Sequence, residues 1–376
     1  MEDIIFSKSE LKTRRSFMKK SMMGVSALSL SPLMVSGCAS HSKYAAPMNQ
    51  RPVVRPRGKK VSFLPCTDTR EGAYQVLKPL EKEILKGIGN KQVVIKINAG
   101  MIQEKHRHES TDVEQVRGIL DFLKPIHDKP VWIAEGSGGI ALSMFEGYKN
   151  YGYIGIEDEY ICKLVDHNDH PTAIKWIRAG HQHPRPIEIV GTYFDPNVYL
   201  ISACRLKSAG GVIVTLGLKN VVMGSPVCHY KSKIRDGRNE KQFMHGGLGS
   251  ARGRELSYNL FTIANAGVYP DLTVLDGVVG AHGNGPWNAD PIEHGVTVAS
   301  TDCIAADRLG AELMGVDYDE LLYLQWCSNA GMGEDDLSKL NILGPDYRDY
   351  IQKYELNENI EIQREWIYEL RKNLSS

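Results

Sequence analysis

Four short apolar runs rich in β-branched residues constrain the fold of this chain most. They cover residues 92–98, 131–134, 271–276 and 296–299. Such runs are typical of strands buried on both faces, as in a parallel sheet. Residues 111–123 have apolar side chains at helical spacing, so the first two runs form a strand–helix–strand unit with a right-handed crossover. We therefore predict an α/β fold: a mostly parallel sheet flanked by helices, in one large domain or two closely packed subdomains.

Three further segments have less regular residue patterns. Residues 211–222 are apolar and predict a helix. Residues 277–285 predict a Gly-rich loop that follows a buried strand. Residues 225–253 form a Gly-, Lys-, Arg- and His-rich stretch, and a loop of that length is usually functional or mobile.

Charge and cysteine content restrict the partners and cofactors. The 376 residues carry 45 Lys and Arg against 45 Asp and Glu, so the net charge is zero. Nucleic acid is not expected as a partner, because such binding depends on neutralising phosphates. The 7 cysteines include no Cys-x-x-Cys pair, which argues against a ferredoxin-type iron–sulfur motif. The cofactor stays unknown, with a divalent metal as one candidate.

The first forty residues resemble an export signal. Arg14 and Arg15 precede an aromatic residue and a lysine, the pattern of a twin-arginine signal. The apolar run 22–35 is shorter than the ~20 residues of a membrane-spanning helix. It is followed by Ser-Gly-Cys, which resembles a lipobox with Cys38 as the lipidated residue. A basic tail followed by a buried helix is the alternative.

These features divide the chain into four expected parts. Residues 1–38 are a twin-arginine signal peptide, 39–59 a flexible tether, 60–350 the α/β domain and 351–376 a C-terminal helix. The expected partners are the twin-arginine translocation machinery and a small-molecule ligand. We expect the protein at the periplasmic face, in contact with the membrane only through the signal peptide or a lipid anchor on Cys38.

Polar residues gather where the predicted strands end. In open α/β sheets, ligands bind beyond the carboxyl ends of the strands. The alternative is that such residues only end strands and cap helices, but their recurrence at four strands favours a site. The predicted crevice is lined by Lys96, Asn98, Glu135, Ser137, Lys207, Lys219, Asp276, His282, Asn284 and Asp302.

Lysines near strand ends or in apolar surroundings are candidate anion clamps. Burying a lysine is costly unless it is paired or directed at an anion, which selects Lys96, Lys207 and Lys219. Salt bridges to acids are the alternative, with Glu135, Asp276 and Asp302 as partners. The residues predicted to bind a cofactor or ligand are Lys96, Asn98, Glu135, Ser137, Lys207, Lys219 and Asn284.

Acids and histidines are candidates for proton transfer or metal binding. Asp276, His282 and Asp302 are the candidate catalytic residues. His245, His282 and Asp302 are candidate metal ligands, and a solvent-exposed histidine is the alternative for each histidine. Neither a His-Glu-x-x-His nor a Gly-x-Ser-x-Gly motif occurs, so a zinc protease and a serine hydrolase are not indicated.

A series of motifs resembles the bacterial and archaeal family called domain of unknown function 362. The motifs lie, in the family's order, at 94–98, 204–207, 216–220, 270–276, 283–286 and 300–307. The resemblance implies an α/β fold and a shared polar site, without a settled activity. The family often has Lys-Thr-His after its central strand, where this chain has Lys207, Ser208 and Ala209, so a role for that histidine does not carry over.

Together these observations predict an exported α/β enzyme. It would bind an anionic small molecule or a metal-associated cofactor at the carboxyl ends of its strands. The alternative is a non-catalytic ligand-binding or maturation partner of a membrane-associated redox enzyme.

Overall fold

The computed structural model describes residue 51 and residues 60–138, 143–180, 183–229, 239–246 and 250–374. The predicted signal residues Arg14 and Arg15 and the predicted lipidation site Cys38 lie outside this part of the chain. Within it, no helix combines the length and apolar character that crossing a membrane requires.

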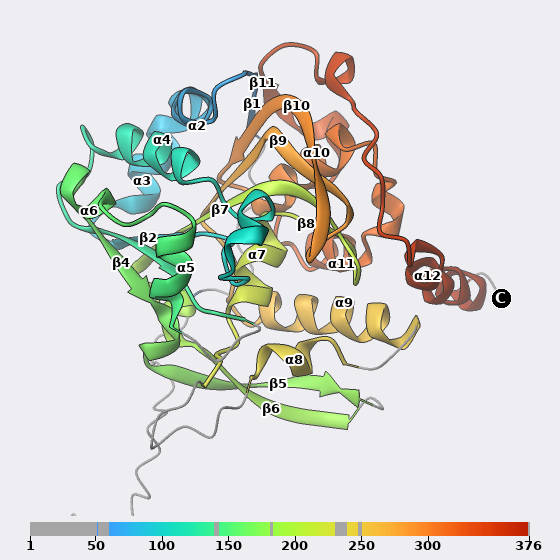
Figure 1. Cartoon of the computed structure of the whole chain (residues 1–376). Helices are drawn as coiled ribbons and strands as arrows, with labels where there is room; N and C mark the ends of the chain where they lie inside the picture. The colour runs from blue at the N-terminus through green and yellow to red at the C-terminus, as the bar shows by residue number, and fades with distance from the viewer. Residues whose placement is uncertain are drawn as a thin grey trace, which may run out of the picture. The chain divides into compact units, whose positions relative to one another are not determined.

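A nine-stranded sheet forms the centre of the fold (Figure 1). Its order is β11-β1-β10-β9-β7-β2-β3-β4, with β8 paired to β7. Neighbours from β4 through β3, β2 and β7 to β9 pair in parallel, whereas β10 is antiparallel to β9 and β1. The strands are β1 Lys60–Pro65, β2 Gln92–Lys96, β3 Val131–Glu135, β4 Cys162–Asp166, β7 Val198–Ala209, β8 Ile213–Thr215, β9 Leu272–Asn284, β10 Asn288–Ser300 and β11 Asn341–Leu343. The predicted mostly parallel α/β fold is confirmed.

Helices cover both faces of the sheet, so there are two hydrophobic cores. In β2, Val93 and Ile95 belong to one core and Val94 to the other, as the alternation of side chains along a strand requires. The first core is covered by α2 Thr69–Leu77, α3 Glu81–Ile88, α4 Val113–Leu123, α5 Met144–Asn150 and α6 Ile156–Glu159. The second is covered by α7 Gly217–Gly224, α9 Ser250–Asn265, α10 Cys303–Leu313, α11 Leu322–Asn329 and α12 Ile360–Leu374.

Smaller elements complete this part of the chain. Strands β5 Thr172–Ala179 and β6 His183–Val190 form a separate antiparallel ribbon, and α8 Lys241–Met244 lies near it (Figure 1). Short 3-10 helices occur at Lys78–Leu80, Glu104–Glu109, His167–Asp169, Gly191–Phe194, Tyr318–Glu320, Leu337–Lys339 and Tyr347–Tyr350.

The predicted loop 277–285 is wrong. Strand β9 continues to Asn284, and β10 returns beside it from Asn288 as a long antiparallel hairpin. Because β10 runs against β9, its end at Ser300 pairs with Thr273 at the start of β9, and the chain leaves β10 away from the carboxyl end of β9. An apolar run reveals that a strand is buried but not which way it runs, which is set by its connection to the preceding strand.

Two other segments also differ from expectation. The predicted helix 211–222 is divided into β8 and α7, and Ile213, the first residue of β8, has a positive φ of 68°. The predicted loop 225–253 includes α8 and the first turn of α9, while residues 230–238 and 247–249 lie outside the described part.

Candidate functional site

A cavity of about 410 Å³ opens at the carboxyl ends of β2 and β3. Residues of α7, α8, α9 and the turn of the β9–β10 hairpin form its other walls. Part of the lining is apolar and comes from Met101, Met223, Leu256, Pro286 and Trp287. A concave site with an apolar wall and a few polar groups is the usual form of a small-molecule site.

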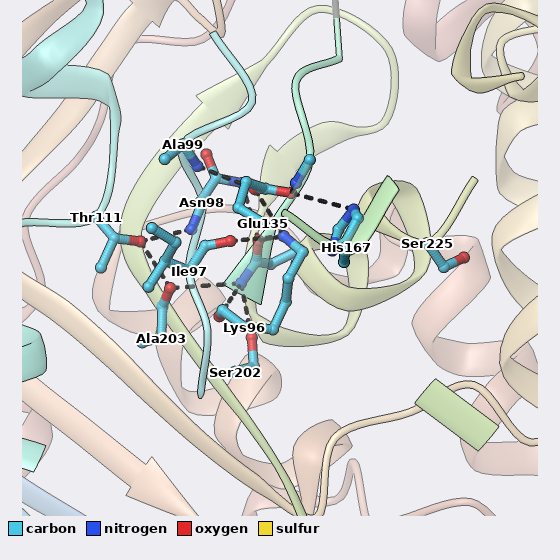
Figure 2. Close-up of polar contacts among 12 residues, drawn as sticks. Lys96, Ile97, Asn98, Ala99, Thr111, Glu135, His167, Ser202, Ala203 and Ser225 are labelled. Atoms are coloured by element: carbon cyan, nitrogen blue, oxygen red, sulfur yellow. Dashed lines mark hydrogen bonds and ion pairs between the residues drawn. The ribbon is translucent and has the colours of Figure 1, made fainter. Parts of the chain in front are cut away.

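Lys96 and Glu135 form a buried ion pair in this cavity (Figure 2). Lys96 ends β2, is fully buried, and its Nζ lies 2.8 Å from Glu135 Oε2. Nζ also donates to Ile97 O at 2.6 Å and to Asn220 Oδ1 at 2.9 Å, so all three of its protons are used. Burial lowers the pKa of Lys96, and the Glu135 carboxylate opposes that effect. For Lys96 the salt bridge, rather than the anion clamp, describes the structure.

Glu135 is also held by its surroundings. Its Oε2 accepts from Ala99 N at 3.0 Å and its Oε1 from Gly136 N at 2.9 Å. Lys241 Nζ lies 3.9 Å from Oε1 and donates to Gly136 O at 2.8 Å. His167 Nε2 lies at the same distance from Oε1, 3.9 Å, and burial with the nearby lysines holds the pKa of His167 well below its ordinary value. A neutral imidazole therefore faces the carboxylate.

Two amide side chains connect this pair to Lys207. Asn220 Oδ1 accepts from Asn98 Nδ2 at 3.0 Å, and Asn98 Oδ1 accepts from Lys207 Nζ at 3.0 Å. Figure 2 shows Asn98 beside Lys96. Lys207 Nζ also donates to Glu109 O at 2.7 Å. Both acceptors of Lys207 are neutral oxygens, and burial lowers its pKa to about 8. Lys207 thus has hydrogen bonds but, within the described part of the chain, no ion-pair partner, although the charge of Glu109 partly opposes the fall in its pKa.

Lys219 is in a similar position on α7. Its Nζ donates to Val214 O at 3.2 Å and to Thr215 Oγ1 at 3.0 Å. Burial, followed by the charges of Lys207 and Arg252, lowers the pKa of Lys219 to about 7. A lysine of this pKa exists in both protonation states near neutral pH.

The solvent side of the cavity adds a further cation. Arg252 of α9 lines the cavity, and its Nη2 lies 3.4 Å from His245 Nδ1. Burial and the Arg252 charge lower the pKa of His245 to about 3, so this imidazole is neutral. Among the described residues, no carboxylate forms an ion pair with Lys207, Lys219 or Arg252. The cavity therefore has an excess of positive charge.

Local packing fixes the helix that carries Lys219 and Asn220. The buried Asp307 carboxylate accepts from Gly217 N at 2.7 Å and from Leu218 N at 2.9 Å, which satisfies the first free N–H groups of α7. Burial raises the pKa of Asp307 to about 7. At the other end of α7, a Cβ on Gly224 would overlap the Lys96 side chain, so this close approach requires glycine.

The structure brings most of the predicted site residues together. Asn284 joins them from the hairpin, where its Oδ1 accepts from Glu358 N at 3.0 Å. The predicted residues that line the cavity are Lys96, Asn98, Glu135, Lys207, Lys219, His245 and Asn284. Sequence reasoning missed Asn220, Lys241 and Arg252, although the last two belong to the basic stretch 225–253 that it singled out.

Four predicted residues do not line the cavity: Ser137, Asp276, His282 and Asp302. Ser137 is buried beside it. Asp276 lies in the middle of β9 opposite Thr297, where burial raises its pKa to about 6. His282 is on the hairpin, and its Nδ1 accepts from Glu355 N at 3.3 Å.

Asp302 is the clearest correction. It lies beyond the end of the antiparallel β10 and caps α10, accepting from Ile304 N at 3.0 Å and Ala305 N at 3.1 Å. Its second oxygen accepts from Glu334 N at 3.0 Å. The structure does not bring the predicted metal set of His245, His282 and Asp302 together: the first lines the cavity, the second is on the β9–β10 hairpin, and the third caps α10.

A cation-lined cavity at the carboxyl edge of a parallel sheet defines an α/β protein with a candidate anion site. The family described as Domain of unknown function (DUF362) matches residues 93–312, and the chain belongs to this family. The resemblance seen in the sequence motifs is thus confirmed. All the cavity lysines and Arg252 fall within the matched segment.

A curated relative extends this comparison. The thylakoid-associated protein sll1697 of Synechocystis sp. is 25% identical over 264 residues, which are 69% of this chain and 75% of the relative. No solved structure matches the chain.

Proposed function

We propose that this chain is an exported protein that binds a small organic anion, a carboxylate or a phosphate, in the cavity. One observation carries the proposal: Lys207, Lys219 and Arg252 line one cavity without a carboxylate partner among the described residues. Of the two acids in the lining, Glu135 and Glu358, the first is already paired with Lys96.

The energetics of burial favour an anionic ligand. A buried cation costs free energy unless an opposite charge compensates it. A carboxylate or phosphate between Lys207 and Lys219 would supply that charge and accept charge-assisted hydrogen bonds. The apolar side chains Met101, Met223 and Leu256 line the same cavity, which suits a ligand with a carbon skeleton rather than an inorganic ion alone.

The lowered lysine pKa values support an enzyme. A general acid or base works best when its pKa is close to the working pH, and burial brings the pKa of Lys219 to about 7. Lys219 Nζ would hold a proton when an anion enters and could release it to a reacting group. Lys207, with a pKa of about 8, would stay protonated and orient the ligand.

Export rests on the sequence. Arg14 and Arg15, the short apolar run 22–35 and Cys38 support twin-arginine export followed by lipid tethering. The thylakoid association of the relative from Synechocystis sp. supports a membrane-associated setting.

A thermal-shift measurement on the purified full chain tests the binding proposal. Citrate and inorganic phosphate are the probes, and we expect citrate to raise the melting temperature more because its three carboxylates can reach several of the cavity cations at once. Lys207→Met and Lys219→Met should abolish the shift, whereas the exposed control Lys105→Met should retain it. Denaturing the protein as purified should release a bound organic anion, which mass spectrometry would identify. Shifts that are equal in all variants would refute the site.

A further inference from the structure

Away from the cavity lining, three metal-binding side chains converge. Glu188 lies on β6, His229 follows α7 in the chain, and Glu240 immediately precedes α8. They are buried, with 6%, 7% and 1% of their surface exposed. One ligand atom from each lies within 4.8 Å of the others, and no other group of His, Cys, Asp or Glu in the described part of the chain meets that spacing.

We propose that Glu188, His229 and Glu240 bind a divalent transition metal ion, with zinc as the best fit. One imidazole and two carboxylates form a mixed nitrogen and oxygen ligand set that zinc accepts. Ligand atoms about 2.1 Å from a tetrahedral zinc lie about 3.4 Å from one another. The distance from His229 Nε2 to Glu188 Oε2 is 3.4 Å, so these two atoms already have the spacing of zinc ligands.

Backbone hydrogen bonds hold the three ligands in place. Val227 N donates to Glu188 O at 3.1 Å, and Glu240 N donates to Val227 O at 2.9 Å. Cys228, the residue before His229, also pairs with Asn239, the residue before Glu240, in an antiparallel bridge. Three chain segments therefore lie side by side before any ion binds, which lowers the conformational entropy that binding must remove.

The ligand types and the surrounding hydrogen bonds agree with a cation here. Thr172 Oγ1 donates to Glu188 Oε2 at 3.1 Å, the kind of outer contact that orients a metal-binding carboxylate. Two carboxylates and one imidazole are also ligand types that a divalent transition metal ion accepts.

The ion would also link the β5–β6 ribbon to the cavity. Glu240 is followed by Lys241, whose Nζ donates to Gly136 O at 2.8 Å and lies 3.9 Å from Glu135 Oε1. A metal on Glu240 would therefore fix the start of α8 and the position of Lys241. All three ligands are buried, which is typical of a structural rather than a catalytic ion.

Zinc uptake by the wild-type full chain is the first test. After treatment with EDTA and dialysis, the protein is mixed with zinc and the bound metal is measured by mass spectrometry. We expect one tightly bound ion per chain and a rise in melting temperature on zinc addition. X-ray absorption should show nitrogen and oxygen ligands with one imidazole. No uptake, sulfur ligation, or several imidazoles around the ion would overturn the proposal.

Variants assign the uptake to these residues. His229→Asn and Glu240→Gln should each lower zinc affinity at least tenfold, while the exposed control His183→Asn on the same ribbon should not. Unchanged affinity in folded His229→Asn protein would overturn the assignment. If either variant fails to fold, the wild-type absorption spectrum still decides the ligand set. Citrate binding by the cavity is measured in parallel, because failure of one site does not imply failure of the other.

Discussion

At the scale of single residues, Lys219 shows how burial changes a side chain. Its pKa falls from 10.5 to about 7, so between these values the folded chain binds fewer protons than the unfolded chain. Stability from this group therefore rises as pH increases through that window, and the charged lysine is most costly below pH 7.

Replacing Lys219 with an apolar residue should increase the stability of the protein by an amount that depends on pH. We expect Lys219→Met to be more stable than the wild type at pH 6, with the difference shrinking towards pH 9. Denaturant midpoints at pH 6, 7.5 and 9 measure it. A difference that is constant across this range would show that Lys219 is not buried as a strained cation.

Loss of the lysine from the Lys96–Glu135 pair should lower the stability of the protein, whereas loss of Lys219 should raise it. Lys96→Met leaves a buried carboxylate without its cation, and we expect a loss of about 3–5 kcal/mol in unfolding free energy. Adding Glu135→Gln removes the charge and should restore much of that loss. The exposed pair of Lys339 and Asp336 is the control, since Lys339→Met should change the unfolding free energy far less than Lys96→Met. Equal effects at both sites would contradict the buried pair.

At the level of secondary-structure elements, a variant of Asp302 can distinguish its observed role as a helix cap from its predicted role as a catalytic residue. As the N-cap of α10, it should contribute about 1–2 kcal/mol, which Asp302→Ala would remove. Citrate binding in the cavity should be unchanged, because Asp302 does not line the cavity. Calorimetric affinity and thermal unfolding of the variant measure both. Loss of binding in a folded Asp302→Ala protein would return this residue to the site.

The strands show which part of the fold could be predicted. The β-branched runs at 92–98 and 131–134 identified β2 and β3 because burial on both faces leaves a continuous apolar pattern. The direction of β10 could not be predicted, because it depends on pairing with β9 through a hairpin turn. The same error placed Asp302 in the crevice.

The part of the site that could be predicted from the sequence consists of residues at the ends of strands. Lys96 and Glu135 end neighbouring parallel strands, so their meeting follows from the sheet. Asn220 and Arg252 come from helices whose packing decides which side chains reach the cavity, and no local pattern reports this. Lys207 could be placed near the site, but only the folded structure shows that no described carboxylate forms an ion pair with it.

At the scale of the whole molecule, export is the property that remains a prediction. We expect Arg14→Lys combined with Arg15→Lys to stop export, because twin-arginine recognition requires the arginine pair. Cys38→Ala should leave export intact but release the protein from the membrane fraction. Fractionation and immunoblotting measure both variants. Unchanged location of the double variant would exclude the twin-arginine route.

Calorimetry of citrate binding at pH 6.5 and pH 8.5 is the decisive test of the proposal that Lys207 and Lys219 form an anion site. A cavity clamped by Lys207 and Lys219 should bind citrate more tightly at pH 6.5, because both lysines are then protonated, and should take up protons on binding at pH 8.5. Lys207→Met should lose at least about tenfold in affinity, as expected for a charged hydrogen bond, and Lys105→Met should match the wild type. Affinity that is independent of pH and unaffected by Lys207→Met would contradict the account.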